Sequence, residues 1–140
     1  MPFIKIWVHL VFGTKSRYPF LNQDVLAKVI THILQNGKEK GIFLDSVNGY
    51  TDHLHCLVSL SASLSIAKTA NLIKGESSFW INKNKLTPHK FEWADEYYAA
   101  SVSESQINRV REYIRNQQEH HKKLSHSEEC EKFIQEYGCK

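Results

Sequence analysis

The chain has 140 residues, 41% of them hydrophobic, and a formal net charge of +3 at pH 7. This length allows one globular domain with its own core, and no linker or low-complexity run divides residues 1–140. The longest apolar runs are too short to cross a bilayer and the N-terminus lacks a signal-peptide pattern, so we expect a cytoplasmic protein without a membrane partner. The small positive charge fits a polyanionic partner, but such a balance is also common among plain enzymes.

The cysteines exclude two further classes of protein. Cys56, Cys130 and Cys139 make an odd count, and no two of them form a Cys-x-x-Cys pair. This pattern argues against a disulfide framework and against a zinc ribbon. We expect ordinary reduced thiols.

The chain begins with a predicted strand and a predicted helix. Residues 3–14 are rich in β-branched and aromatic side chains, which favours one long strand. Apolar residues then recur at helical spacing over residues 25–34. Asn22 is the expected N-cap of this helix, and Gly37 and Gly41 mark its end.

A β-hairpin and a second helix are predicted next. Residues 42–50 and 53–60 are two strand-like segments, joined by a turn at Asn48-Gly49 or shortly after. Residues 64–82 then predict the second helix.

The last third of the chain predicts one more strand and a third helix. The strand is expected over residues 91–102 and the helix over residues 103–124. Ser103 and Gln106 have the spacing of a capping box at the start of this helix. A short amphipathic tail helix is expected over residues 125–140.

The order of these elements predicts the fold class. Strand, helix, strand, strand, helix and strand is the ferredoxin-like α+β pattern, an antiparallel sheet with two helices packed on one face. In this pattern the strand at residues 53–60 is central. The additional C-terminal helix, which carries Tyr113, is the natural cover for the opposite face of the sheet.

The motif with the most chemical content is His53-Leu54-His55, in the predicted central strand. Side chains alternate along a strand, so His53 and His55 project from one face, about 7 Å apart at the Cα level. Such a pair can hold a divalent metal or grip a phosphate, although a chance pair is not rare among eight histidines. A histidine-triad hydrolase would need a third histidine at Leu57, and a two-histidine phosphoesterase would need Thr or Ser at His55. The motif therefore needs partners from elsewhere in the chain.

A second group of polar side chains lies on the predicted third helix. Its buried stripe consists of Ile107, Val110 and Ile114. Tyr113 and Gln117, four residues apart, lie together along one edge of that stripe. Taken alone, they fit an aromatic residue that packs at a rim and a solvated neighbour.

Four stretches of the chain, in this order, carry a family resemblance: residues 8–17, His53-Leu54-His55, residues 72–78, and residues 93–103 followed by Tyr113. Together they resemble the HUH single-tyrosine transposases of the insertion-sequence 200 type and their relatives associated with repetitive extragenic palindromes. The resemblance covers most of the chain, and the order and spacing are specific to this group. Replication initiators usually pair the tyrosine with a lysine one turn on, where this chain has Asn116 and Gln117. Conjugative relaxases place the tyrosine before the histidines.

The resemblance implies a transposase that cleaves and rejoins single-stranded DNA. Tyr113 would be the nucleophile that forms a 5′-phosphotyrosine link and frees a 3′-hydroxyl. His53, His55 and Gln117 would hold one divalent metal, Mg²⁺ or Mn²⁺, which stabilises the charge on the phosphate. Ligand preference alone favours a softer ion than Mg²⁺ at two imidazoles and an amide. His120, one turn beyond Gln117, stays open as an alternative ligand.

The resemblance also implies partners. These are single-stranded DNA, in the form of hairpin ends of an insertion element, and a second copy of the chain. Two element ends need two nucleophiles and the chain offers one credible nucleophile, so we expect a homodimer. Whether Tyr113 acts on the histidines of its own chain or of its partner stays open at this point.

The candidate DNA-binding residues are basic or aromatic. The candidates for phosphate binding are Lys15, Arg17, Lys74, Lys83, Lys85 and Lys90, and the candidate stacking surfaces are Trp80, Trp93 and Tyr97. Lysines on helix faces are more often simply solvated. Two other function classes remain open: a nucleic-acid-binding module of this fold without cleavage, and a metal-dependent phosphoesterase that acts on small nucleotides.

Overall fold

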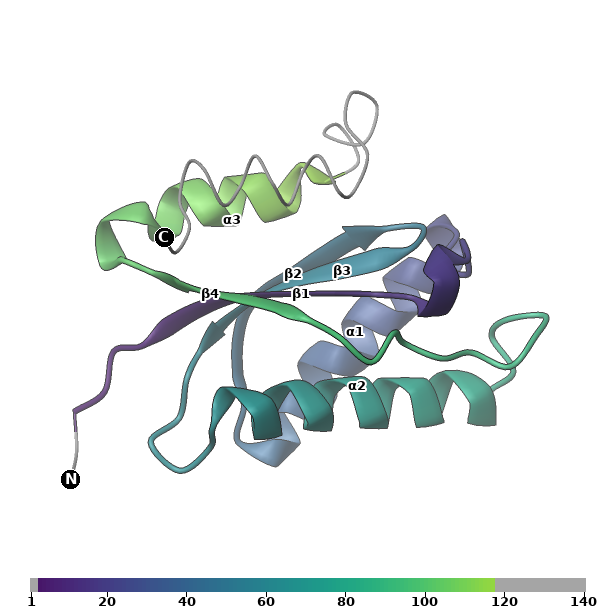
Figure 1. The fold of residues 1–140 in the computed structure, drawn as a ribbon, viewed down its shortest axis with the longest axis horizontal. Coiled ribbons are helices and arrows are strands. Elements are labelled where there is room, and N and C mark those ends of the chain that lie inside the picture. Colours follow the sequence, from purple (N-terminus) through teal and green to yellow (C-terminus); the bar gives the residue numbers. More distant parts are fainter. Residues whose placement is uncertain (1–2, 118–140) are drawn as a thin grey trace.

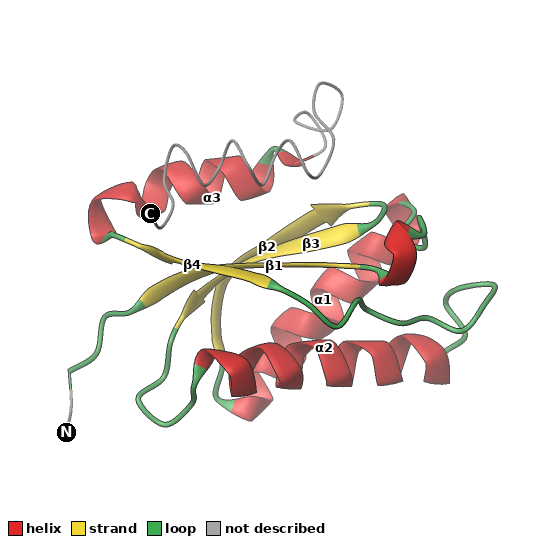
Figure 2. Cartoon of the chain, viewed as in Figure 1, coloured by secondary structure: helices red, strands yellow, loops and turns green. Residues whose placement is uncertain are grey.

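A computed structural model describes residues 3–117 of the chain. A four-stranded antiparallel sheet, in the order β2-β3-β1-β4, lies at its centre (Figure 1). The strands and helices are β1 (Trp7–Gly13), η1 (Lys15–Arg17), α1 (Gln23–Lys40), β2 (Phe43–Tyr50), β3 (His53–Ser59), α2 (Ile66–Lys83), β4 (Tyr98–Val102), η2 (Glu104–Gln106) and α3 (Ile107–Arg115), where η denotes a short 3-10 helix. Helices α1 and α2 cover one face of the sheet, and α3 lies over the other (Figure 2). The predicted ferredoxin-like α+β fold with a central β3 is confirmed.

The two long helices begin with the side-chain caps that their sequences favour. Asn22 Oδ1 accepts a hydrogen bond of 3.0 Å from the backbone N–H of Val25 at the start of α1. Ser65 Oγ accepts a similar bond of 3.0 Å from the N–H of Lys68 at the start of α2. Gly41 ends α1 in the left-handed conformation, at φ 73°, where a side chain would be strained. Among the helices of residues 3–117, none has the length and apolar composition that crossing a bilayer requires.

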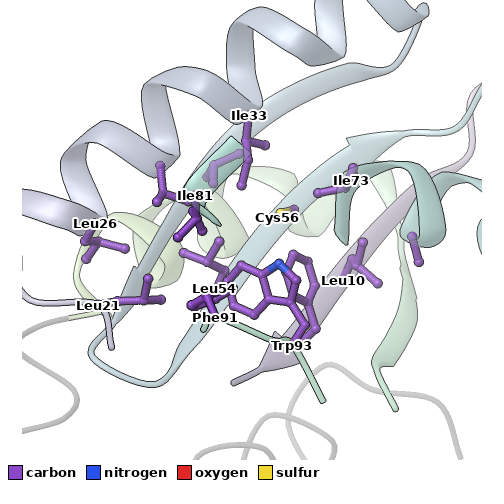
Figure 3. Packing of buried hydrophobic residues seen from close by; sticks show 14 of the residues in the cluster. Leu10, Leu21, Leu26, Ile33, Leu54, Cys56, Ile73, Ile81, Phe91 and Trp93 are labelled. Carbon is purple, nitrogen blue, oxygen red and sulfur yellow. The ribbon is translucent and has the colours of Figure 1, made fainter. Parts of the chain in front are cut away.

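The main core lies between the sheet and the helices α1 and α2. Leu10 and Phe12 of β1 and Leu54 and Cys56 of β3 belong to this core and are at most 1% exposed. Figure 3 shows Leu10, Leu54 and Cys56 among the packed side chains. They share one face because side chains alternate along each strand. Burial raises the pKa of the Cys56 thiol to about 12, so this cysteine stays neutral and free.

Helix α3 packs on the opposite face through the stripe that its sequence predicts. This smaller core consists of Leu57, Val102, Ile107, Val110 and Ile114. The odd-numbered residues of β3 therefore lie beneath α3. His53 and His55 belong to this set, which places the histidine pair between the sheet and α3.

Two predicted strand boundaries are wrong. The first strand begins at Trp7 and not at residue 3, and the last strand begins at Tyr98 and not at residue 91. The aromatic residues in the segment before β4 fill the main core instead of extending the strand. Phe91 is 1% exposed, and its N–H donates to Asn82 Oδ1 at 2.8 Å, so α2 takes the hydrogen bond that a neighbouring strand would have supplied.

The predicted capping box of the third helix is also absent. Ser103 makes no side-chain bond to the helix, and its Oγ lies 3.2 Å from Ser105 Oγ instead. Because η2 intervenes, α3 starts only at Ile107. The predicted end of this helix, His120 and the predicted tail lie outside the described residues.

The turn of the hairpin follows Tyr50, at Thr51 and Asp52, shortly after the Asn48-Gly49 pair. Gly49 lies within β2, where a Cβ would overlap the carbonyl oxygen of His53. The glycine therefore permits the close approach of β2 to the strand that carries the histidine pair.

Candidate active site

The face of the sheet beneath α3 carries buried histidines from two neighbouring strands. In the register of β1 with β3, Gly13 lies opposite His53 and Val11 lies opposite His55. His9 lies two residues before Val11, on the same face of β1. The side chains of His9, His53 and His55 are all at most 1% exposed.

Helix α3 brings Tyr113 to these histidines, and the residues just after its end bring Gln117, within one chain. The ring of Tyr113 lies edge-on against His55, with the ring centroids 5.7 Å apart and an interplanar angle of 77°. It lies similarly against His9, at 6.1 Å. Gln117 Oε1 lies 3.3 Å from His53 Nε2. The tyrosine, the amide and the histidine pair that the sequence analysis singled out thus share one site.

Asp52 and Arg17 form a chain of hydrogen bonds to His53. Asp52 Oδ1 lies 2.8 Å from His53 Nδ1, and Arg17 Nη2 donates to Asp52 Oδ2 at 3.0 Å. Burial alone would raise the pKa of Asp52, but the hydrogen bond from His53 and the charges of His53 and Arg17 outweigh it and lower the pKa to about 2. The carboxylate is therefore an acceptor for the Nδ1 proton of His53, and whenever the ring is neutral in this bond Nε2 keeps a lone pair.

The side-chain oxygen of Gln117, Oε1, faces His53 Nε2. Gln117 Nε2 donates to the carbonyl oxygen of Tyr113 at 3.2 Å, which fixes the orientation of the amide. A flipped amide would set Oε1 against that carbonyl, oxygen against oxygen. Hence Oε1 faces His53 Nε2, and when His53 is neutral and donates from Nδ1, both of these atoms are acceptors. A cation placed at this point would satisfy both.

His9 lies behind His55. His9 Nε2 is 2.8 Å from His55 Nδ1, and the two rings stack with their centroids 5.0 Å apart. Our sequence analysis overlooked His9 and Asp52 as members of the site. Asp52 directly precedes His53, and strand alternation together with the β1–β3 register would have placed His9 beside His55.

The described residues 3–117 contain no group of three His, Cys, Asp or Glu side chains that could hold a metal ion. His53 and His55 supply imidazole nitrogens, so a third ligand from this part of the chain would have to be of another type. The amide oxygen of Gln117 is such a ligand.

Two polar contacts hold α3 on β2. Asn48 Nδ2 donates to the carbonyl oxygens of Ile114 and Arg115, each at 3.0 Å. Arg111 donates two hydrogen bonds to the carboxylate of Asp45, from Nε at 2.9 Å and from Nη2 at 2.7 Å. The hydrogen bond from Arg111 keeps the pKa of Asp45 below its ordinary value. These contacts fix the turn of α3 that carries Tyr113.

The basic residues predicted to bind DNA lie in two places. Lys15 and Arg17 follow β1, at the end of the sheet where Gly13 lies opposite His53. Lys15 Nζ pairs with Glu92 at 2.9 Å, and this hydrogen bond raises the pKa of Lys15. Both residues are thus near the histidine pair, but each already has an acidic partner.

The remaining lysines are on or beside α2, across the sheet from the histidines. Lys74 Nζ donates to the carbonyl oxygen of Asp95 at 3.0 Å, and burial lowers the pKa of Lys74. Lys83 lies in the last turn of α2, and Lys85 follows this helix with φ at 51°. Lys90 Nζ lies 3.5 Å from Glu92. The structure does not bring this group together with Tyr113.

The three aromatic candidates differ in exposure. Trp93 is 7% exposed, and its Nε1 donates to Ser77 Oγ at 2.9 Å, so its ring is part of the core and offers no free face to a base. Trp80 stacks on His32 with the ring centroids 4.1 Å apart. Tyr97 is 36% exposed and is the most accessible of the three.

Comparison with known proteins identifies a family and several solved structures of similar fold, among them two transposases. The family model described as "Transposase IS200 like" matches residues 3–117. A proposed transposase from Deinococcus radiodurans R1 is 24% identical, with a TM-score of 0.64 over 83% of this chain and 93% of that chain. A REP-associated tyrosine transposase, solved with a REP hairpin bound, is 13% identical, with a TM-score of 0.64 over 86% of this chain and 72% of that chain. At these identities both structures show a shared fold, and a search of curated proteins gave no match.

Proposed function

This chain belongs to the IS200-like transposase family, and from that premise we propose that it cleaves and rejoins single-stranded DNA with Tyr113 as the nucleophile. One observation carries the proposal. Tyr113 lies edge-on against His55, and Gln117, four residues later, faces His53 in the same chain. A tyrosine that only packed at the rim of a helix would not need a buried histidine pair and an amide oxygen beside it.

The residues fit one divalent metal. His53 Nε2 and Gln117 Oε1 are acceptors 3.3 Å apart, and His55 comes from the same face of β3. We assign these three side chains as the ligands of Mg²⁺ or Mn²⁺, and their two nitrogens favour Mn²⁺. When bound, the ion would withdraw electron density from the scissile phosphate and stabilise the charge of the transition state.

The covalent step exchanges one phosphate ester for another. The Tyr113 hydroxyl oxygen bonds to the scissile phosphorus, and the bond from phosphorus to the 3′ oxygen of the preceding nucleotide breaks. The phenol proton is released as the leaving 3′ oxygen gains a proton, so a 5′-phosphotyrosine and a free 3′-hydroxyl result. Attack by another 3′-hydroxyl on the phosphotyrosine reverses the exchange. Because each step replaces one ester with another, rejoining needs no ATP.

The substrate that we propose is a single strand with hairpin ends from an insertion element. The REP-associated relative was solved with a REP hairpin, which supports a hairpin ligand for this fold. Lys15 and Arg17 are the nearest phosphate-binding candidates, and Lys74, Lys83 and Lys85 would serve DNA on the other side of the sheet. We propose a homodimer because two element ends need two tyrosines.

Within that dimer, we propose that each Tyr113 acts beside the histidines of its own chain. The ring of Tyr113 contacts the ring of His55 in the same chain, which supports this arrangement. The single chain therefore already contains the nucleophile and the proposed ligands.

A labelled hairpin with a single-stranded flank, incubated with Mn²⁺, tests this function. The wild type should form a covalent protein–DNA adduct that Tyr113→Phe and EDTA both abolish. Tyr18→Phe is a matched control, because Tyr18 lies after η1, is 46% exposed, and should leave the adduct unchanged. An adduct that persists in Tyr113→Phe would identify another nucleophile. Binding without any adduct would favour the non-catalytic module, and hydrolysis of small nucleotides without an adduct would favour a phosphoesterase.

The double variant His53→Ala with His55→Ala separates the metal assignment from the nucleophile. We expect it to bind DNA but to lose cleavage. Cleavage at the wild-type rate would remove the histidines from the proposed metal site while leaving Tyr113 as nucleophile.

A further inference from the structure

We propose that His9 is a positioning residue for His55, accepting the proton of His55 Nδ1 so that His55 Nε2 keeps its lone pair for the metal. The inference rests on the proposed function in one respect, the metal at His53, His55 and Gln117. It adds a residue on β1 to a site otherwise built from β3 and α3.

The burial of His9 needs an explanation. Its side chain is 0% exposed, in the middle of a strand whose register places it opposite Leu57 on one side and Ala100 on the other. A buried polar ring is unfavourable unless its nitrogens are hydrogen-bonded. An apolar side chain beside Leu57 would pack without this cost. The position is therefore better explained by a contact that needs a nitrogen.

That contact is the bond between His9 Nε2 and His55 Nδ1, at 2.8 Å. Only one of these two nitrogens can carry the proton between them. If His55 donates, its other nitrogen, Nε2, is unprotonated and can bind a metal. If His9 donates, the neutral His55 ring is protonated at Nε2 and cannot serve as a ligand. Metal binding at His55 Nε2 therefore requires that His55 Nδ1 donates this hydrogen bond to His9 Nε2.

His53 supplies a parallel within the same site. Its Nδ1 is held by Asp52 at 2.8 Å, which leaves Nε2 toward Gln117. A ligating histidine commonly donates its second N–H to an acceptor that fixes the tautomer and the ring orientation. His9 gives His55 the acceptor that Asp52 gives His53.

His9 is also held in place by aromatic neighbours. Its ring stacks on His55 at an interplanar angle of 21° and meets the edges of Tyr98 and Tyr113, at centroid distances of 6.3 and 6.1 Å. An acceptor fixed in this way holds the His55 ring in one orientation. The same packing makes Phe a suitable replacement that keeps the ring and removes the nitrogen.

The first test measures Mn²⁺ affinity in the absence of DNA, by electron paramagnetic resonance of the free ion. Loss of an outer partner of a ligating histidine typically weakens metal binding about tenfold to a hundredfold, and we expect His9→Phe to show a loss of that size. His9→Gln, whose amide oxygen can accept the same proton, should recover most of the affinity. His32→Phe is the matched control, because His32 stacks on Trp80 of α2 and should bind Mn²⁺ as the wild type does.

Three outcomes would overturn the proposal. These are wild-type affinity in a folded His9→Phe, no recovery in His9→Gln, and no Mn²⁺ binding by the wild type. A wild type that binds Mn²⁺ with the expected series but forms no DNA adduct would contradict the proposed function and leave the role of His9 intact.

The second test needs no variant of His9 and covers the case in which His9→Phe does not fold. Nitrogen-15 NMR of the metal-free wild type reports which ring nitrogen of His55 carries the proton, with His55→Gln used to assign the signals. We predict protonation at Nδ1 and an unprotonated Nε2. The opposite tautomer would overturn the proposal.

Discussion

At the scale of single residues, the meeting of His53 with Gln117 is the contact that most needs a function. Gln117 Oε1 lies 3.3 Å from His53 Nε2, while Asp52 holds His53 Nδ1 and the Tyr113 carbonyl holds the amide nitrogen of Gln117, so in a neutral His53 that donates to Asp52 the two facing atoms are those that a cation would join. A protein that gained nothing from this contact would be better served by an apolar residue at Gln117. The contact is the observation that most directly supports the proposed metal site.

This reading predicts opposite effects on stability and on metal binding. Gln117→Leu removes one of the two acceptors, so the metal-free protein should melt at the same temperature as the wild type or higher. Loss of a direct metal ligand should weaken Mn²⁺ binding at least as much as loss of a residue that hydrogen-bonds to a ligand. The Mn²⁺ affinity of Gln117→Leu should therefore fall about tenfold or more. Gln117→Glu keeps an oxygen ligand and should retain binding. If Gln117→Leu bound Mn²⁺ like the wild type, Gln117 would not be a ligand.

Only some residues of the site could be predicted from the sequence. Helical spacing placed Tyr113 and Gln117 on one edge of a helix and strand alternation placed His53 and His55 on one face, because both patterns are local, but their joint role was implied by the resemblance to the transposase family. Asp52 and His9 were missed because their roles depend on contacts with other side chains. In the case of His9 the contact joins two strands 46 positions apart in the sequence.

At the scale of elements, the docking of α3 decides whether Tyr113 meets the histidines. Leu57 of β3 packs against Val110 and Ile114, and the side-chain amide of Asn48 binds the last carbonyl groups of the helix. The proposed ligands, His53 and His55 on the sheet and Gln117 just after α3, are at most 1% exposed. The docking of α3 therefore decides both the stability of this face of the sheet and the position of Tyr113 beside the histidines.

We expect Asn48→Ala to weaken this docking. The variant loses two hydrogen bonds to the carbonyl oxygens of Ile114 and Arg115. At about 1 kcal/mol for each bond, the free energy of unfolding should fall by about 1–2 kcal/mol, measured by urea denaturation. Asn71→Ala, on the exposed face of α2, is the control and should be neutral or slightly stabilising. An unchanged midpoint in Asn48→Ala would mean that Asn48 does not hold the helix.

The elements also show why some boundaries could not be predicted. The long helices followed from periodicity and caps within their own sequence. The segment before β4 has the aromatic composition of a strand, yet Phe91 bonds to Asn82 of α2 and Trp93 bonds to Ser77. These partners come from tertiary packing, and composition does not reveal them.

At the scale of the whole molecule, the fold and the family agree with the order of the motifs along the chain. The sheet order β2-β3-β1-β4 places the two histidine-bearing strands side by side at its centre, and α3 crosses over them (Figure 1). The sequence pattern predicted this topology, because the order of elements restricts the possible sheets. The meeting of α3 with the histidines within one chain required the three-dimensional structure.

This arrangement predicts the outcome of a mixing experiment. Tyr113→Phe and the double variant His53→Ala with His55→Ala are co-expressed with different tags, and the heterodimer is purified. If each tyrosine acts within its own chain, both copies are defective and no DNA adduct should form. Adduct formation by the heterodimer would show that the tyrosine of one copy serves the histidines of the other.

The most direct test of the central claim is to locate the covalent link. A hairpin substrate with Mn²⁺ is allowed to react, the protein is digested, and the peptide that carries the 5′-phosphate of the DNA is sequenced by mass spectrometry. The account predicts a phosphotyrosine link at Tyr113, in a reaction that EDTA abolishes. A link at any other residue, or strand cleavage without a covalent link, would contradict it.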